Sequence, residues 1–311
     1  MKAVRIHSFG GPEVLVYEDA ARPVPAAGEV LVKVHATSLN PVDRFTRAGF
    51  LQGMVNFALP LVPGLDLAGV VEALGDGVTS VAVGDAVYGH SNMKRQGTYA
   101  EYAVVGAGEI APKPSSADFV TAASVSLAAL TAWQGLFDVA GLQAGKTVLI
   151  HGAGGGVGSF AVQFAVAKGA RVFGTAGSDK IDLLRELGAA EAIDYTTTRF
   201  EDVAHDVDVV FDTVGGDLLE RSLTVLKPGG IFVTPAGQPD AAAAAARGVR
   251  ASGMMAQANP AQLTKIAGLI DAGTARPIVS TVLPLEQASQ AHALLEAGHT
   301  RGKIVLRVVQ D

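Results

Sequence analysis

The glycines of segment 151–158 (HGAGGGVG) carry the clearest chemical signature in the chain. A buried apolar run at 148–151 precedes them, and a helical pattern at 157–168 follows. Glycines allow a sharp turn whose N–H groups approach a pyrophosphate closely, and the helix N-terminus adds partial positive charge. A flexible loop is the alternative for glycines alone, but the flanking strand and helix favour a dinucleotide site. The fingerprint positions fall on Ala153, Gly155 and Gly158, with Gly156 and Val157 between them.

The end of the next predicted strand, 171–175, distinguishes NAD from NADP. An NAD site places a carboxylate about twenty residues after the fingerprint, where it binds the ribose 2′-hydroxyl. Here Ala176 follows Thr175 at that place, so no acid repels a 2′-phosphate. Ser178 and Lys180 can donate hydrogen bonds to such a phosphate. Ser178 could equally be a helix N-cap, and Lys180 a solvated helix residue. Beside the missing acid, the pair favours NADPH.

Composition narrows the classes of protein that fit. A chain of 311 residues is long enough for two domains, and its abundant glycine and small residues suit an α/β fold. The net charge of −6 and the lack of Lys/Arg clusters argue against a nucleic-acid partner. The absence of cysteine excludes disulfides, thiolate nucleophiles and cysteine-liganded zinc. No stretch is apolar enough to span a membrane, and the N-terminus does not resemble a signal peptide, so we expect a cytoplasmic protein.

The pattern of predicted elements changes near residue 124. Residues 1–123 contain short β-like runs at 30–36, 69–74, 86–89 and 99–104, which predict a mostly antiparallel barrel or sandwich. From 124 on, strands at 148–151, 171–175, 192–194, 207–211 and 231–234 alternate with helices such as 157–168 and 179–187. This alternation predicts a parallel, doubly wound sheet. Strands at 277–283 and 303–309 around a helix at 285–297 could return to the first domain. The alanine run 241–246 is interpreted as a short helix or a surface loop.

Several motifs together resemble the medium-chain dehydrogenase/reductase superfamily. They are segments 38–43 (SLNPVD), 63–71 (PGLDLAGVV), the glycine turn and 298–303 (GHTRGK). Within it, the chain is similar to the zinc-independent quinone oxidoreductase and enone (alkenal) reductase branch. The resemblance implies a GroES-like, mostly-β domain from 1–123 and 275–311, a Rossmann NADPH-binding domain from 124–274, and a cleft between them. It also implies a homodimer formed by edge-to-edge pairing of a strand around 249–254.

The resemblance also implies further cofactor contacts. Thr131 could instead be a helix residue that bonds its own backbone, and Tyr195 a half-buried aromatic at a strand end. Val214 and Ala236 follow the ends of parallel strands, where the fold itself places cofactor contacts. The full set that the resemblance assigns to the dinucleotide is Thr131, Tyr195, Val214, Gly215, Ala236, Gly237 and Lys303.

The positions that bind zinc in the metal-dependent relatives hold poor ligands here. Asn40 stands at the first cysteine position, and Leu65 and Asp66 stand where those relatives have a His-Glu pair. Leucine cannot ligate a metal, and an amide oxygen is a poor zinc ligand. The seven histidines show no ligand-like spacing, so we expect no metal. Without a Lewis acid, alcohol oxidation is disfavoured.

Without a metal, the chemistry left to the cofactor is hydride transfer to an acceptor that is already activated. An enone, enal or quinone fits, because its charge delocalises to oxygen as hydride arrives. We expect the pocket in segments 40–51, 54–61 and 253–259, with Asn40 as the candidate catalytic residue that hydrogen-bonds the carbonyl; a turn residue before Pro41 is the alternative. Related quinone reductases carry tyrosines after Asp43, where this chain has none, so no proton donor is assigned. The predicted pocket residues are Asn40, Phe45, Phe50, Met54 and Met255.

Two other classes of function stay open. A non-catalytic NADPH-binding protein, crystallin-like or regulatory, would keep the same glycine turn. A zinc alcohol dehydrogenase is disfavoured by Leu65 and the missing cysteines. Turnover with a panel of enones and quinones separates the first alternative, and metal analysis the second. The sequence does not specify which enone or quinone is the substrate.

Overall fold

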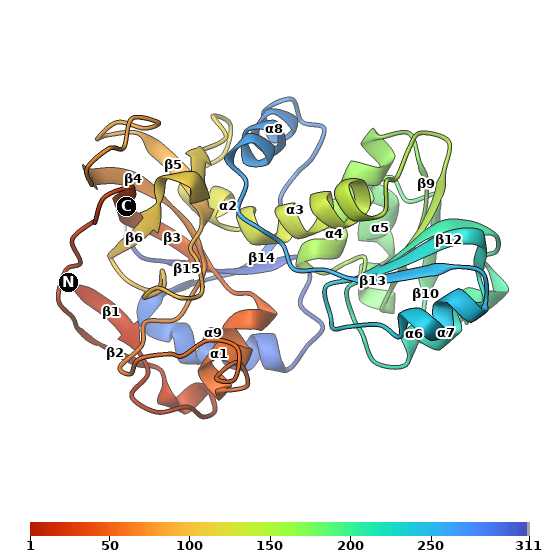
Figure 1. The fold of residues 1–311 in the computed structure, drawn as a ribbon, viewed down its shortest axis with the longest axis horizontal. Helices are drawn as coiled ribbons and strands as arrows, with labels where there is room; N and C mark the ends of the chain where they lie inside the picture. Colours follow the sequence, from red (N-terminus) through yellow and green to blue (C-terminus); the bar gives the residue numbers. More distant parts are fainter. Residues whose placement is uncertain (310–311) are drawn as a thin grey trace. The chain divides into compact units, whose positions relative to one another are not determined.

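The computed structural model describes residues 1–309 and contains two compact units (Figure 1). Unit 1 comprises residues 1–127, 258–273 and those described from 277 on, and unit 2 comprises Ala128–Gln257 and Thr274–Arg276. Helix α8 (Pro260–Asp271) groups with unit 1, where the Tyr88 hydroxyl donates to the Leu263 carbonyl at 2.6 Å. The expected domain boundaries place this helix in the Rossmann half instead.

Unit 2 is built on a six-stranded sheet in which every pairing is parallel, in the order β10-β9-β8-β11-β12-β13. The chain builds outward from β8 to one edge, then returns to β11 and builds to the other edge. The predicted parallel, doubly wound sheet is therefore confirmed. The strands are β8 (Thr147–His151), β9 (Arg171–Ala176), β10 (Glu191–Asp194), β11 (Val207–Asp212), β12 (Leu226–Thr234) and β13 (Arg250–Gly253).

The helices of unit 2 cover both faces of this sheet, with α4 and α5 on one face and α6 and α7 on the other (Figure 1). The alanine run forms α7, whose N-terminus is capped by the Asp240 carboxylate, which accepts from the N–H groups of Ala242 and Ala243. The helices are α3 (Ser126–Trp133), continued by a π-helical turn at Gln134–Val139, α4 (Gly156–Ala167), α5 (Ile181–Glu186), α6 (Leu218–Ser222) and α7 (Ala241–Ala246).

Unit 1 contains a seven-stranded sheet in which β14-β15-β3-β4-β5-β7 are neighbours and β6 also pairs with β3. All pairings are antiparallel except β14 with β15. The C-terminal β15 lies against β3, so the end of the chain completes the N-terminal sheet, as expected. The strands are β1 (Lys2–Arg5) and β2 (Val16–Asp19), which form a separate pair, β3 (Glu29–Ser38), β4 (Asp66–Leu74), β5 (Ala86–His90), β6 (Tyr102–Gly106), β7 (Ile110–Pro112), β14 (Val279–Pro284) and β15 (Lys303–Arg307).

Two local predictions in unit 1 differ from the structure. The strand expected at 99–104 is Tyr102–Gly106, because Tyr99 bonds the Pro63 carbonyl outside any strand. Helix α1 (Pro41–Ala48) was not predicted. Its start is nevertheless encoded, since the Asn40 N–H donates to the Asp43 carboxylate at 2.8 Å and Pro41 takes the first helical position. The remaining helices of unit 1 are α2 (Phe119–Ala123) and α9 (Ala288–Glu296).

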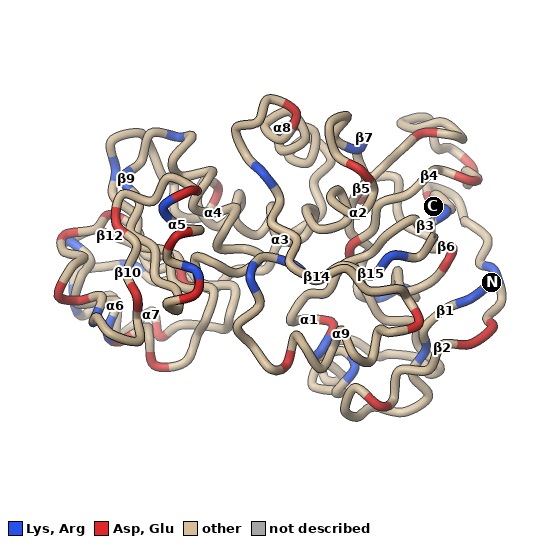
Figure 2. Tube along the Cα trace, turned by 180° about the vertical axis from the view of Figure 1, so that it is seen from behind, with Lys and Arg blue, Asp and Glu red and all other residues tan. Residues whose placement is uncertain are grey.

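Charge is dispersed over both units. Figure 2 shows lysine and arginine interspersed with aspartate and glutamate along the chain. Within residues 1–309, no helix combines the length and apolarity needed to cross a bilayer.

Candidate functional site

The glycine turn joins β8 to α4 as predicted. Gly152 has a φ of +68°, a conformation that favours glycine, and it turns the chain sharply after His151. The Ala153 N–H donates to the Thr175 carbonyl at 3.0 Å and fixes the turn to the next strand. Gly155 is the N-cap of α4, and as a glycine it has no side chain that could cap the helix. The first N–H groups of the helix are thus left available to an anion.

The glycines of this turn have different surroundings. A Cβ on Gly158 would lie 2.2 Å from the Gly152 carbonyl oxygen and 2.7 Å from the Ala153 Cα, so this glycine permits close packing of helix on strand. A Cβ on Gly155 would meet only the Gly152 carbonyl oxygen, at 3.3 Å. With this single neighbour within 4 Å, Gly155 is far less crowded than Gly158, which suits close approach of a pyrophosphate. These are the properties that the second and third fingerprint glycines require.

At the end of β9, the residues predicted to bind a 2′-phosphate have partners within unit 2. The Ser178 hydroxyl donates to the Asp194 carboxylate at 2.5 Å. Lys180 is 7% exposed and packs beside Gly154, where a glycine Cβ would lie 2.7 Å from its Cδ, and its ammonium lies 3.9 Å from Asp179. Hydrogen bonds from Ser178 and Thr196 hold the pKa of the Asp194 carboxyl below its usual value.

Asp194 was not among the predicted site residues. Asp194 ends β10 and is in register with Ala176 at the end of β9. An acid therefore lies on the neighbouring strand, beside the position where an NAD site has its carboxylate. The predicted strand at 192–194 was the available signal. The pairing of two parallel strand ends was not visible in the sequence.

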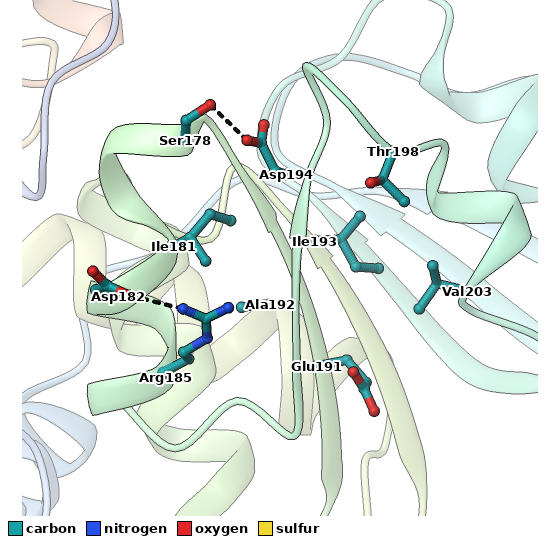
Figure 3. Close-up of a pocket in the computed structure, with 10 residues that line it drawn as sticks. All are labelled: Ser178, Ile181, Asp182, Arg185, Glu191, Ala192, Ile193, Asp194, Thr198 and Val203. Carbon is teal, nitrogen blue, oxygen red and sulfur yellow. Dashed lines mark hydrogen bonds and ion pairs between the residues drawn. The ribbon is translucent and has the colours of Figure 1, made fainter.

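A surface cavity of about 470 Å³ runs along β10, one of the two edge strands of the sheet. Figure 3 shows Ser178 and Asp194 facing each other at one end, and the Asp182–Arg185 ion pair, 2.8 Å long, on the side of α5. Its wall is mixed and more polar than apolar, with apolar side chains from α5, β10 and the following loop. Its lining residues are Ser178, Ile181, Asp182, Arg185, Glu191, Ala192, Ile193, Asp194, Thr198 and Val203.

The other predicted cofactor residues of unit 2, apart from Thr131, lie at strand ends or just after them. The Thr175 hydroxyl is buried against His151 Nδ1 at 3.0 Å, and burial lowers the pKa of His151 to about 4. Tyr195 is exposed after β10, with its hydroxyl 3.7 Å from where a Cβ of Gly177 would be. Val214 and Gly215 follow β11, Ala236 and Gly237 follow β12, and Thr131 is buried in α3.

The loop after β11 is fixed by Asp212. This buried carboxylate accepts the N–H groups of Val214 at 2.9 Å and Gly215 at 3.1 Å. Burial raises the pKa of the Asp212 carboxyl above its usual value, although these two hydrogen bonds oppose the shift. The loop is therefore held in one conformation at the switch point between β8 and β11.

Unit 1 places Asn40, Asp66 and Lys303 in one buried cluster. The Lys303 ammonium lies 2.5 Å from Asn40 Oδ1, 2.8 Å from the Leu39 carbonyl oxygen and 3.2 Å from Asp66 Oδ2. Asp66 Oδ2 also accepts from Asn40 Nδ2 at 2.8 Å and from the Ser38 hydroxyl at 2.7 Å. Asp66 is fully buried and Lys303 is 5% exposed. Lys303, predicted to contact the dinucleotide, thus directs its ammonium to oxygens of unit 1.

A second buried chain of polar groups begins at Asp43. Tyr99 Oη lies 3.5 Å from Asp43 Oδ2 and 3.2 Å from His292 Nε2, and His292 Nδ1 lies 3.2 Å from the Arg47 guanidinium. Arg47 also forms a short ion pair with Glu296. Burial raises the pKa of the Asp43 carboxyl to about 7, and burial with the nearby Arg47 charge lowers the pKa of His292 to about 3. This chain fixes helix α1 to helix α9.

Two buried polar atoms near Asp66 have no hydrogen-bond partner among residues 1–309. They are His90 Nε2 and the Ser126 hydroxyl oxygen. His90 pairs with Asp66 across β4 and β5, and Ser126 precedes Leu127, whose N–H donates to Asp66 Oδ1 at 2.8 Å. Neither residue was predicted, because an isolated histidine or serine carries no sequence signal of its own.

The apolar pocket residues predicted in unit 1 are accessible. Phe50 is 74% and Met54 67% exposed, and Phe45 packs edge-on against Phe50 with ring centroids 6.2 Å apart. Met255, in unit 2, is also exposed. Exposed aromatic and methionine side chains of this kind are typical of a surface that binds an apolar ligand.

The zinc positions hold the residues expected from the sequence. The Asn40 amide is engaged by Lys303 and Asp66, and Leu65 is buried. Across the described part of the chain, no three His, Asp or Glu side chains are grouped as a metal site would require.

Residues 26–115 match the family described as alcohol dehydrogenase GroES-like domain, and residues 187–306 match the family described as zinc-binding dehydrogenase. The chain is 34% identical to the quinone oxidoreductase of Mus musculus, over 98% of this chain and 97% of that protein. It is 36% identical to the chloroplastic NADPH-dependent alkenal/one oxidoreductase of Arabidopsis thaliana, over 98% of this chain and 79% of that protein.

Solved structures agree with this assignment. The quinone oxidoreductase of Coxiella burnetii is 36% identical and superposes with a TM-score of 0.91 over 99% of both chains. The Escherichia coli quinone oxidoreductase complexed with NADPH is 29% identical, with a TM-score of 0.90 over 99% of this chain and 100% of that one. The predicted GroES-like and Rossmann organisation is confirmed. The chain belongs to the medium-chain dehydrogenase/reductase superfamily, in its quinone oxidoreductase branch.

Proposed function

We propose that this protein is an NADPH-dependent reductase of α,β-unsaturated carbonyls or quinones that works without zinc. The observation that carries the proposal is the β8–α4 turn, in which Gly158 permits close packing and Gly155, the N-cap of α4, has one neighbour near its Cβ position. NADPH, when bound, supplies the hydride. The relatives named for quinone and alkenal/one reduction, and the one solved with NADPH, support the same activity.

The residues of each unit have distinct roles in this proposal. In unit 2, Gly155, Gly156, Val157 and Gly158 hold the pyrophosphate. Other contacts to the dinucleotide come from Thr131, Ala153, Thr175, Ser178, Lys180, Tyr195, Val214, Gly215, Ala236 and Gly237.

In unit 1, Asn40 supplies an amide hydrogen bond to the substrate oxygen. This bond strengthens as negative charge develops on that oxygen, which stabilises the enolate or hydroquinone anion. The exposed Phe45, Phe50 and Met54 contribute apolar contacts to the ring or alkene of the substrate, as does Met255 of unit 2. Because no tyrosine follows Asp43 in α1, we assign the final proton to solvent.

Product analysis with a simple enone tests the reaction. With NADPH deuterated at the transferred position, the expected product is a saturated ketone that carries deuterium at the β-carbon. A quinone assayed in parallel should give the hydroquinone. An allylic alcohol labelled at the carbonyl carbon would show that the reaction is carbonyl reduction. Tight NADPH binding without turnover across the enone and quinone panel would favour a non-catalytic NADPH-binding protein.

We further propose that the protein is a cytoplasmic homodimer, paired through β13. This strand is an edge of the unit 2 sheet, and an unpaired edge is an aggregation hazard that two-fold pairing removes. Light scattering at micromolar concentration should give twice the mass of the chain. A proline in place of Ala251, within β13, should shift the mass towards the monomer. A monomeric wild type would overturn this part of the proposal.

A further inference from the structure

The segment that contains the exposed Phe45, Phe50 and Met54 carries a single accessible charge. No aspartate or glutamate occurs from residue 44 to residue 65, and the charged side chains of this segment are Arg44 and Arg47. Arg47 is buried and already forms its ion pair with Glu296. Arg44 is partly exposed. The accessible charge of this apolar segment is therefore positive, and it belongs to the Arg44 guanidinium.

The Arg44 guanidinium lies over an exposed aromatic ring. Its central carbon is 4.9 Å from the centroid of the Phe45 ring, and Phe45 in turn packs edge-on against Phe50. The Phe50 N–H donates to the Phe45 carbonyl at 3.0 Å, which ties the chain after α1 back to this helix. A cation above a ring is attracted by the negative charge of the ring face. This contact uses none of the five N–H donors of the guanidinium in a conventional hydrogen bond.

Within residues 1–309, these donors have no hydrogen-bond acceptor and no carboxylate partner. Arg250 and Arg301 also lack such a partner in that range, but both are exposed and neither lies over a ring. Arg44 thus combines a free guanidinium with adjacent apolar side chains. A guanidinium binds a carboxylate through two parallel N–H···O bonds, and it does so more strongly where apolar groups displace water.

We propose that Arg44 selects substrates in which the enone or quinone is joined to a carboxylate. This inference rests on the proposed function, because it names the substrate class for the surface formed by Phe45, Phe50 and Met54. The apolar part of such a molecule contacts the two rings, and its carboxylate accepts from the Arg44 guanidinium. The carboxylate takes no part in hydride transfer, so this contact stabilises the bound substrate and the transition state equally. Its effect is a lower KM with kcat unchanged.

Paired substrates test this selection. Each pair consists of a linear enone that ends in a carboxylate and its methyl ester, which keeps the alkene, the ketone and the chain length. The pairs span several chain lengths, because the reach from the reacting carbon to Arg44 sets the length that fits. In Arg44→Met, the ratio of kcat/KM for acid to ester should fall about five- to twentyfold, mainly through the KM of the acid. In the wild type, this ratio should also fall in high salt. A ratio that Arg44→Met leaves unchanged at every chain length would overturn the proposal.

Arg301→Met is the matched control. Arg301 also belongs to unit 1 and has no acidic partner in the part of the chain that the structure describes, but it has no ring contact. This variant removes the same charge from the same unit, and the ratio of acid to ester should stay within about twofold of wild type. An equal fall in both variants would show that net charge, and not the contact with Arg44, attracts the acid, and the proposal would be wrong.

Binding of a saturated keto acid gives a readout that does not need turnover. This ligand keeps the ketone and the carboxylate but has no alkene to reduce. In calorimetric titrations of the NADPH-bound protein, Arg44→Met should bind the keto acid about five- to twentyfold more weakly than wild type does. Equal affinities for the keto acid would overturn the proposal. If the wild type reduces no enone or quinone, the proposed function fails, and this titration still decides whether Arg44 binds a carboxylate.

Discussion

The Ser178 hydroxyl donates its single proton to the Asp194 carboxylate, 2.5 Å away, at the place where a 2′-phosphate is expected. Ser178 must leave Asp194 before it can donate to a phosphate. Hydrogen bonds from Ser178 and Thr196 lower the pKa of Asp194, so this carboxylate is charged at neutral pH. A negative charge there would oppose a 2′-phosphate, so we expect Asp194 to moderate the preference for NADPH.

Asp194→Asn should tighten NADPH binding and leave NADH binding nearly unchanged, because only NADPH carries the extra phosphate. A gain of about two- to fivefold is expected for an exposed charge, and it should shrink in high salt. Fluorescence titration of both cofactors measures it. Ala176→Asp is the opposite variant, since it restores the acid of an NAD site, and it should weaken NADPH binding. Equal gains for both cofactors in Asp194→Asn would show that charge on the 2′-phosphate is not the cause.

Gly155 and Gly158 should separate cofactor binding from folding. Gly155→Val places its Cβ 3.3 Å from the Gly152 carbonyl oxygen, so it should cost less stability than Gly158→Ala while NADPH affinity falls by at least about thirtyfold. Gly158→Ala places a methyl group 2.2 Å from the Gly152 carbonyl, and it should lower the free energy of unfolding by about 2–4 kcal/mol. Thermal unfolding and cofactor titration on both variants are needed. A loss of stability in Gly155→Val as large as that in Gly158→Ala would contradict the looser surroundings of Gly155.

Activity should survive prolonged chelation. The amide of Asn40 is a poor zinc ligand, and the side chain of Leu65 cannot bind a metal. The positively charged ammonium of Lys303 already lies beside Asn40 and Asp66. Dialysis against a chelator, followed by metal analysis and assay, should give unchanged turnover and an unchanged Tm. Activity that disappears and returns with added zinc would indicate a metal site that these residues do not explain.

Ser126 and Ser124 should respond in opposite ways to substitution by alanine. The Ser126 hydroxyl is buried without a partner in the described chain, so Ser126→Ala should be neutral or up to about 1 kcal/mol more stable. Ser124 is equally buried, but its hydroxyl donates to the Thr121 carbonyl at 2.7 Å, and Ser124→Ala should lose about 1 kcal/mol. Denaturant unfolding compares them. A destabilised Ser126→Ala would show that the hydroxyl has a partner in solution.

Much of this structure could be predicted from local patterns in the sequence. The glycine turn was predictable because strand, glycines and helix are contiguous, and their geometry depends on neighbours in sequence. The strands of unit 2 were found for the same reason. Helix α1 was missed because it is short and begins with a proline, although Asn40 and Asp43 encode its start.

The cluster around Asn40 shows what local reasoning could not supply. Lys303 is separated from Asn40 by 263 residues and reaches it only because β15 pairs with β3. Sequence similarity placed Lys303 near the cofactor, and it could not reveal that the ammonium faces an amide. The Asp194 pairing with Ser178 likewise depends on the register of β10 against β9. Both relationships are tertiary, and periodicity does not encode them.

The pH dependence of stability should report on Asp43. Burial raises its pKa from 3.8 to about 7, so the folded state retains a proton that the unfolded state has released between these values. The contribution of Asp43 is therefore fully present below pH ~4 and is lost as pH rises towards 7. Burial lowers the pKa of His292 and of His151, to about 3 and about 4, and both therefore contribute in the opposite direction. The variant Asp43→Asn removes only the first contribution. Its unfolding free energy, relative to wild type, should increase steadily from pH 4 to pH 7 in denaturant titrations. Parallel curves for the two proteins across this range would show that Asp43 titrates alike in the folded and unfolded states.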